Sequence, residues 1–270
     1  MAIRTTLLDV GGTFIKCADG RSISVNSNGS REEIASSLRL AVGEADAVAA
    51  AVPGPFDYEH GVFLMKHKFS AVYGERFADL CGKPDTPMRF IHDVNCMLLG
   101  ETAEGNGRGY SRVALVTLGT GLGFSMSIEG RILKSPAGSP LVSIYSLPYR
   151  DGVLEDYASK RGFLRAYGCS DITVKEIAGR ALNGDRQARK TFDDVGRLIA
   201  GAIAPILEEY AIEALLFGGQ ISRSFALMAE SVECGLKNIS SLKFVGPVSD
   251  IDNATFKGLK HLADDIIAKR

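Results

Sequence analysis

Short apolar runs alternate along the chain with segments in which apolar residues recur every three to four positions. The short runs predict buried strands, and the periodic segments predict amphipathic helices. Beyond two β-meanders, strands are expected at residues 45–52, 61–64, 88–91, 212–217 and 243–245, and helices at 30–42, 71–81, 94–104, 173–182, 185–210 and 254–269. This alternation predicts an α/β fold.

The first meander begins with the segment Leu7–Lys16, LLDVGGTFIK, in which an apolar strand leads into two glycines and a threonine. Gly11 and Gly12 let the backbone turn tightly and bring N–H groups close to a bound anion. Thr13 adds a hydroxyl donor and Lys16 adds a positive charge. The combination suits a phosphate group.

The residues after this turn continue as strand, turn and strand, because the Asp-Gly pair at Asp19 signals a second hairpin. The pattern therefore differs from a dinucleotide fingerprint, in which glycines open a helix. Asp9, near the end of the first strand, would point toward the same crevice as the glycines, where it could hold a hydrated magnesium ion. An ordinary glycine-rich hairpin fits this stretch equally well.

A similar arrangement returns about a hundred residues later, where residues 113–134 read VALVTLGTGLGFSMSIEGRILK. Gly119, Thr120 and Gly121 form the expected turn between two strands. Two phosphate-type hairpins predict two related halves, each opening with a β-meander. The polar, glycine-rich segment 104–110 is the predicted crossover between them.

Two further segments stand at the ends of predicted strands, where ligands of open α/β sheets bind. Pro53–Pro55 cannot continue a central strand and predicts a rigid loop, which could equally be a purely structural turn. Asp93 follows one strand directly and precedes a helix. It could cap the helix or could accept a proton from a substrate hydroxyl.

Composition is that of an ordinary globular protein: 46% of the 270 residues are hydrophobic and 23% are charged. The net charge of −1 offers no basic excess for binding nucleic acid. The five cysteines form no C-x-x-C pair, so free thiols are expected. Neither a leader segment nor an apolar run of roughly 18 residues is present, which predicts a cytoplasmic protein without a membrane partner.

Five motifs occur in the order found in the ROK family of sugar kinases, which the chain therefore resembles. They read DVGGTFIK, PGPFD, HDVNCMLLGE, TLGTGLG and LFGGQIS. The resemblance implies two ribonuclease-H-like domains of the actin-like ATPase superfamily flanking a nucleotide/sugar cleft. The domains are expected at residues 1–107 and 108–253, with the terminal helix, 254–270, packing back on the first.

The resemblance also implies roles for individual residues. Asp93 matches the general base, and Pro55 and His92 would line the sugar site, although His92 replaces the usual asparagine. Glu155 matches a sugar-binding glutamate; an acid on a helix surface is the alternative. Gly218 and Gly219 match the adenosine motif, although a helix-packing turn would explain them too.

The sequence departs from the family pattern after Ala137 and Gly138, where Ser139 follows in place of the first sugar-binding glutamate and the expected histidine is missing. The zinc loop has no cysteine or histidine ligands before Cys169, so no zinc site is expected. Residues 66–68, Lys-His-Lys, replace a segment that contacts the sugar in many family members. They are either solvated or, if they face the cleft, favour an anionic substrate.

The resemblance implies an ATP-dependent kinase acting on a hydroxyl of a hexose or hexose derivative, with Mg²⁺ as cofactor. A sugar- or nucleotide-binding protein that has lost activity is the alternative, since the glutamate and histidine are missing. A sugar-responsive regulator fits less well, because no helix-turn-helix precedes the first strand. The sequence does not determine the sugar, the nucleotide preference or the oligomeric state, for which a homodimer is one option.

Overall fold

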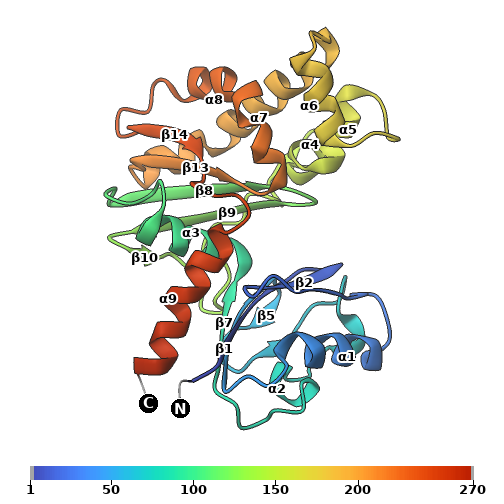
Figure 1. Ribbon diagram of the computed structural model, residues 1–270. Coiled ribbons are helices and arrows are strands. Elements are labelled where there is room, and N and C mark those ends of the chain that lie inside the picture. Colours follow the sequence, from blue (N-terminus) through green and yellow to red (C-terminus); the bar gives the residue numbers. More distant parts are fainter. Residues whose placement is uncertain (1–2, 269–270) are drawn as a thin grey trace. The chain divides into compact units, whose positions relative to one another are not determined.

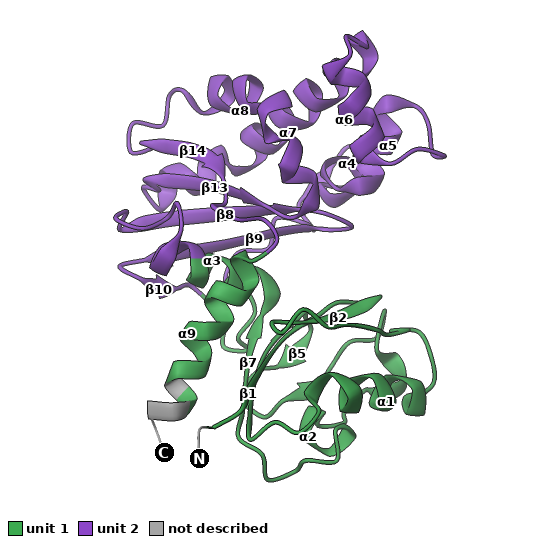
Figure 2. Ribbon diagram, viewed as in Figure 1, with its two compact units in different colours: residues 1–100, 134–140, 253–270 green, residues 101–133, 141–252 purple. Residues whose placement is uncertain are grey.

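The computed structural model describes residues 3–268, which fall into two compact units (Figure 2). Among these residues, unit 1 draws on 3–100, 134–140 and 253–268, and unit 2 on 101–133 and 141–252. This division differs from the predicted domains, because residues 101–107 belong to unit 2 and the excursion 134–140 belongs to unit 1. Residues 269 and 270 of the predicted terminal helix lie outside the described residues.

Unit 1 is built on a five-stranded sheet with the order β3-β2-β1-β4-β7, of which Figure 1 labels β1, β2 and β7. The first three strands form the predicted antiparallel meander, and β1, β4 and β7 run parallel. The strands are β1 (Thr5–Val10), β2 (Phe14–Cys17), β3 (Ser22–Ser24), β4 (Ala47–Val52) and β7 (Met88–His92). A small hairpin of β5 (Phe56–Asp57) and β6 (Val62–Phe63) lies between β4 and β7 in the chain.

Helices cover both faces of this sheet, because β4 is apolar on both sides. Its Val48, Ala50 and Val52 belong to the core with α1 (Arg31–Val42), which begins with a capping box formed by Ser30 and Glu33. Its three other alanines belong to a second core with α9 (Ala254–Ala268) and α3 (Asp93–Glu104). The terminal helix therefore packs on the unit 1 sheet, as predicted for its described residues.

The helix predicted at residues 71–81 is wrong. The chain instead forms a short 3-10 turn, η1 (Ser70–Val72), and one turn of helix, α2 (Phe77–Leu80). Gly74 separates them with a φ of 81°, a conformation incompatible with a continuous helix. Its N–H donates to the carbonyl of Phe63, so tertiary hydrogen bonding overrides the helical pattern.

Unit 2 repeats the strand arrangement of unit 1, with the order β10-β9-β8-β13-β14 and the same parallel and antiparallel pairs. Its strands are β8 (Arg112–Leu118), β9 (Leu122–Ile128), β10 (Arg131–Ile132), β13 (Ala214–Gly218) and β14 (Phe244–Pro247). The prediction of two related halves, each opening with a β-meander, is thus confirmed.

The helices of unit 2 pack with the sheet in a single large core. They are α4 (Glu155–Ala158), α5 (Lys160–Tyr167), α6 (Val174–Leu182), α7 (Arg186–Glu209), the 3-10 segment η2 (Gln220–Leu227) and α8 (Ala229–Leu236). A two-stranded ribbon, β11 (Pro148–Tyr149) and β12 (Gly152–Val153), precedes α4. The loop before it is held by buried Ile144, whereas Leu141 and Tyr145 are exposed. Of the helices described, none has the length and apolar character needed to cross a bilayer.

Candidate active site

Three predicted segments meet at the carboxyl edge of the unit 1 sheet. Asp9 pairs with Ala51 of β4, and Val52 pairs with His92 of β7, so the ends of these parallel strands lie side by side. The glycine turn after β1, the Pro53–Pro55 loop after β4 and Asp93 after β7 therefore share one edge. This is the position at which open parallel sheets bind ligands.

Asp93 is fixed at the junction of β7 and α3. Its Oδ1 accepts a 2.8 Å hydrogen bond from the Val94 N–H and lies 2.8 Å from Nδ1 of His92. Burial acts to raise the pKa of Asp93, but the charge and hydrogen bond of His92, the Val94 N–H and the Lys68 ammonium outweigh it and lower that pKa. Its side chain is still 40% exposed. Asp93 is thus an ionised carboxylate open to a ligand.

The surroundings of His92 include a residue that sequence reasoning missed, Tyr58. Its hydroxyl donates to the carbonyl of Val52 at 3.0 Å, and it also bonds to the Ser139 side chain. A Cβ on Gly54 would lie 3.3 Å from both the Tyr58 hydroxyl and the His92 ring, so the loop packs tightly against both. A tyrosine shortly after Pro-Gly-Pro carries no local signal of this role.

Ser139 lies in the excursion of residues 134–140, which belongs to unit 1. Asn95 of α3 anchors this excursion by donating to the carbonyl of Gly138 at 3.2 Å. A Cβ on Gly138 would lie 2.8 Å from the ring of Tyr58. The excursion therefore packs onto the same cluster as His92, although it carries no carboxylate.

Asp9 faces Lys16 directly across the β1–β2 pair. Burial, followed by the charge of Asp93, raises the pKa of Asp9 to about 6, and Lys16 opposes this shift. Within residues 3–268, no hydrogen-bond donor reaches its carboxylate. A partly buried carboxylate without a donor, close to a second carboxylate, fits a hard cation such as Mg²⁺. The described side chains include no cluster of three or more His, Cys, Asp or Glu suited to a metal.

The first glycine turn is closed by the Gly11 N–H, which donates to the carbonyl of Phe14 at 2.9 Å. Gly12 is fixed by a second hydrogen bond, in which its carbonyl accepts the Ser27 N–H at 3.2 Å. Thr13 is exposed, as a phosphate-binding hydroxyl would need to be. The structure thus brings the predicted turn residues together with Asp9 and Lys16.

Unit 2 presents the other predicted phosphate and nucleotide residues at its own sheet edge. Gly119, Thr120 and Gly121 connect β8 to β9, and the pairing of β13 with β8 places Gly218 and Gly219 next to them. A Cβ on Gly219 would lie only 2.4 Å from the carbonyl oxygen of Leu118. The two glycine segments are therefore in direct backbone contact.

Glu155 lies beside the unit 2 turn. Its Oε2 accepts the Leu122 N–H at 3.0 Å, and its Oε1 pairs with Arg161 at 2.8 Å. A Cβ on Gly121 would lie 2.8 Å from Oε2, so the carboxylate packs directly against this glycine. The carboxylate therefore supports the turn, a contact that sequence reasoning did not predict.

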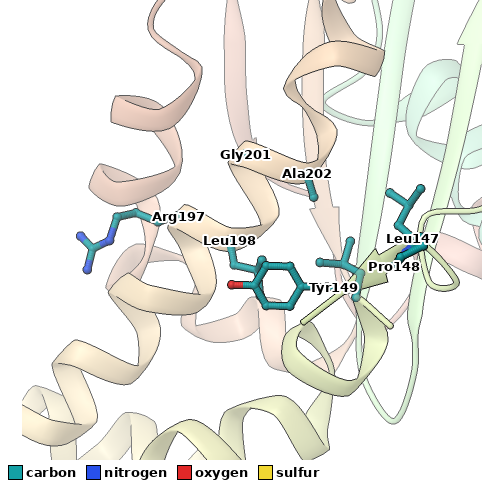
Figure 3. A pocket seen from close by; sticks show the side chains of 8 residues that line it. Leu147, Pro148, Tyr149, Arg197, Leu198, Gly201 and Ala202 are labelled. Atoms are coloured by element: carbon teal, nitrogen blue, oxygen red, sulfur yellow. The ribbon is translucent and has the colours of Figure 1, made fainter. Parts of the chain in front are cut away.

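Two cavities lie in unit 2. One of about 460 Å³ follows the Gly218–Gly219 turn and is lined by Ser222, Arg223, Phe225, Ala226, Ala229, Pro247, Val248, Ser249 and Ile251. The other, of about 470 Å³, lies between α7 and the β11 ribbon and contains none of the predicted site residues. Figure 3 shows Tyr149 of the ribbon beside Leu198 of α7, with the Arg197 guanidinium directed away.

Comparison with known proteins shows one family. The family model described as ROK family matches residues 8–140 and 148–259. A glucokinase of Thermotoga maritima is 28% identical over 208 residues, which span 67% of this chain and 66% of that protein. An N-acetyl-D-glucosamine kinase of Salmonella paratyphi B is 24% identical over 213 residues, which span 71% of this chain and 70% of that protein.

The fold is shared with solved structures over almost the whole chain. A ROK family glucokinase from Streptomyces griseus, in complex with glucose and AMPPNP, superposes with a TM-score of 0.79 and 21% sequence identity. The superposition covers 96% of this chain and 98% of that one. The two-domain actin-like ATPase fold predicted from the sequence is thereby confirmed.

Proposed function

The chain belongs to the ROK family, and from that premise we propose that it is an ATP-dependent kinase that phosphorylates a hydroxyl group of a hexose or hexose derivative. Its curated relatives are named as a glucokinase and an N-acetyl-D-glucosamine kinase. The alignment spans just under two thirds of the glucokinase's length, so the substrate is part of the proposal. The observation that carries it is the ionised, partly exposed Asp93 beside a glycine turn.

Asp93 acts as the general base in this proposal. The O–H bond of the sugar breaks and its proton passes to the Asp93 carboxylate, while the sugar oxygen bonds to the γ-phosphorus of ATP and the bond to the departing ADP oxygen breaks. The lowered pKa keeps Asp93 ready to accept the hydroxyl hydrogen bond at neutral pH. His92 positions the carboxylate from one side, and Pro55 and Glu155 are proposed to contact the sugar.

The glycine turns supply the phosphate contacts in this proposal. Gly11, Gly12 and Thr13, and separately Gly119, Thr120 and Gly121, present backbone N–H groups and hydroxyls suited to phosphate oxygens. The 460 Å³ cavity after Gly218 and Gly219 offers room for the adenosine. Asp9 would hold Mg²⁺ through water, and the ion would supply positive charge to neutralise the phosphates.

The first test replaces Asp93 by asparagine. Asparagine Oδ1 can still accept the Val94 N–H, so the fold should persist, whereas the proton acceptor is removed. We expect kcat to fall by about 10²- to 10⁴-fold, the range of general-base loss. Turnover would be measured with ATP and a panel of hexoses, amino sugars and acidic sugars.

Asp85→Asn provides the control, because it removes the charge of an exposed carboxylate on the same unit. Wild-type kinetics are expected for this variant. If the wild-type chain phosphorylates no sugar in the panel, the protein is instead a sugar- or nucleotide-binding member of the family. If folded Asp93→Asn stays fully active, Asp93 is not the general base.

A further inference from the structure

The loop of residues 65–69 is rigidly attached to the unit 1 glycine turn. Met65 and Phe69 are completely buried, and the Phe69 N–H donates to the carbonyl of Ser27 at 2.6 Å. Ser27 in turn donates its N–H to Gly12. Phe69 adopts φ 54° and ψ 23°, a left-handed conformation that is unusual for a bulky residue. Such strain marks a backbone position that the surroundings hold in place.

This backbone directs Lys68 toward the candidate active site. Its Cδ lies 4.0 Å from the position that a Cβ on Gly12 would take. The residue is partly buried, and within residues 3–268 its ammonium makes no hydrogen bond and has no carboxylate oxygen within 4.0 Å. Its charge is nevertheless close enough to contribute to the lowered pKa of Asp93.

The two neighbouring basic residues do not share this arrangement. Lys66 is exposed, and its Nζ lies over the ring of Tyr73, 5.4 Å from the ring centre. His67 is exposed as well. Of the three basic residues that replace the sugar-contacting segment, only Lys68 both lies beside the glycine turn and has a charge that acts on Asp93. Lys66 is a natural control for the loss of one positive charge.

We propose that Lys68 binds an anionic oxygen brought between Gly12 and Asp93. The proposal rests on the kinase function above, in which two anions reach this position: the phosphoryl group being transferred, or an acidic group on the sugar acceptor. A lysine ammonium without an ion-pair partner can donate charge-assisted hydrogen bonds to either anion. With the phosphoryl group, the contact stabilises the charge of transfer.

The decisive experiment titrates inorganic phosphate into the full chain without nucleotide or sugar, followed by ³¹P NMR. Lys68→Met should raise the dissociation constant at least about 10-fold, whereas Lys66→Met should leave it within about 2-fold of wild type. Lys68→Arg should retain phosphate binding, because it keeps the charge. Thermal melts of all three variants would establish that each is folded.

Kinetics then identify the source of the anion. Glucose and glucose 1-phosphate form a matched neutral and acidic pair of acceptors. If Lys68 contacts the transferred phosphoryl group, Lys68→Met lowers kcat at least about 10-fold with both acceptors. If it contacts an acidic acceptor, only turnover of glucose 1-phosphate falls.

The proposal is overturned if phosphate binds equally well to wild type and Lys68→Met, or binds to neither. The phosphate titration needs no turnover, so it judges Lys68 even if the chain phosphorylates no sugar. In that event the kinase function fails while the anion site stands. Equal kinetics of Lys68→Met and Lys66→Met in an active enzyme would likewise contradict the proposal.

Discussion

The glycine turns at Gly11–Thr13 and Gly119–Gly121 follow the first strand of two sheets with the same strand order. The two strands that each turn connects are paired residue by residue. The second cross-strand pair from the turn is Asp9 and Lys16 in unit 1, and Thr117 and Gly123 in unit 2. The charged side chain beside the turn is also different. In unit 1, Ser27 packs on Gly12 and the charged neighbour is the cation Lys68, whereas in unit 2 the charged neighbour is the anion Glu155.

The shared strand arrangement therefore produces a glycine turn in both units, but it does not determine which charged side chain lies beside that turn. Neither Lys68 nor Glu155 belongs to the repeated sheet, since Lys68 precedes η1 and Glu155 begins α4. Segments added to the common framework therefore give one turn a cation for ligand binding and give the other a carboxylate that already accepts a backbone N–H. The two turns are expected to respond differently to substitution.

The largest effect on stability is expected at Gly219, which directly follows β13 and packs against the backbone of Leu118, just before the unit 2 turn. Its φ of 82° and ψ of 163° lie in a region that only glycine adopts readily, and an added Cβ would lie 2.4 Å from the Leu118 carbonyl oxygen. We expect Gly219→Ala to lower the unfolding free energy by about 2 to 6 kcal/mol, from backbone strain and overpacking together. Urea denaturation measures this loss.

Gly119→Ala is the matched control, because a Cβ there meets no atom within 4 Å. Its unfolding free energy should stay close to that of wild type, while ATP binding weakens if phosphate approaches the backbone at this turn. Equal destabilisation by both substitutions would show that the Gly219 contact does not hold the unit 2 edge together.

An intermediate and pH-dependent effect is expected at Asp9 in unit 1. Because its pKa is raised to about 6, the folded state favours the protonated form, so its contribution to stability is complete below pH 4 and is lost as the pH rises through 6. Asp9→Asn should therefore leave stability unchanged at pH 4 and raise it by at most about 3 kcal/mol at pH 7.5. The measurement is urea unfolding in EDTA.

Asp85→Asn, which alters an exposed carboxylate, should show no comparable gain at pH 7.5. Adding Mg²⁺ should reduce the advantage of Asp9→Asn, since a bound cation stabilises the ionised wild-type carboxylate. If the gain is independent of pH, burial of the Asp9 charge is not its cause.

The smallest effect on stability is expected at Glu155. Glutamine can still accept the Leu122 N–H, and the partner Arg161 is 58% exposed, so the lost ion pair is well screened. Glu155→Gln should cost about 1 kcal/mol or less in unfolding free energy. Kinetics add a second readout, because a sugar contact would raise mainly the KM for sugar.

Arg161→Gln separates the two roles of the carboxylate, since it leaves the hydrogen bond to Leu122 intact and removes the ion pair, together with a second pair of Arg161 to Asp156 at 3.1 Å. It should therefore be as stable as Glu155→Gln or slightly less stable. A much larger loss of stability in Glu155→Gln would mean that the charged carboxylate is the main support of the unit 2 turn. Glu155 would then have a structural role, in contrast to the ligand-binding role proposed for Lys68.

The sequence alone determined the elements that short-range interactions specify. Apolar runs located the strands of both sheets, and apolar residues at helical spacing located α1. The repeated strand-glycine-strand pattern predicted two related halves, and the ends of the parallel strands placed Asp9, Pro55 and Asp93 at one edge. These features could be predicted because each depends on neighbours within a few residues or on a general rule of sheet topology.

Tertiary structure decided the rest, because it depends on contacts between residues distant in sequence. Gly74 interrupts the predicted helix through a hydrogen bond to Phe63. The sequence left residues 66–68 as either solvated or ligand-binding. In the folded chain, Phe69 is buried and its N–H donates a hydrogen bond to the Ser27 carbonyl. These contacts place Lys68 beside Gly12 and leave Lys66 exposed to solvent. A side chain's direction is set by the packing of its loop, which no local pattern of residues encodes.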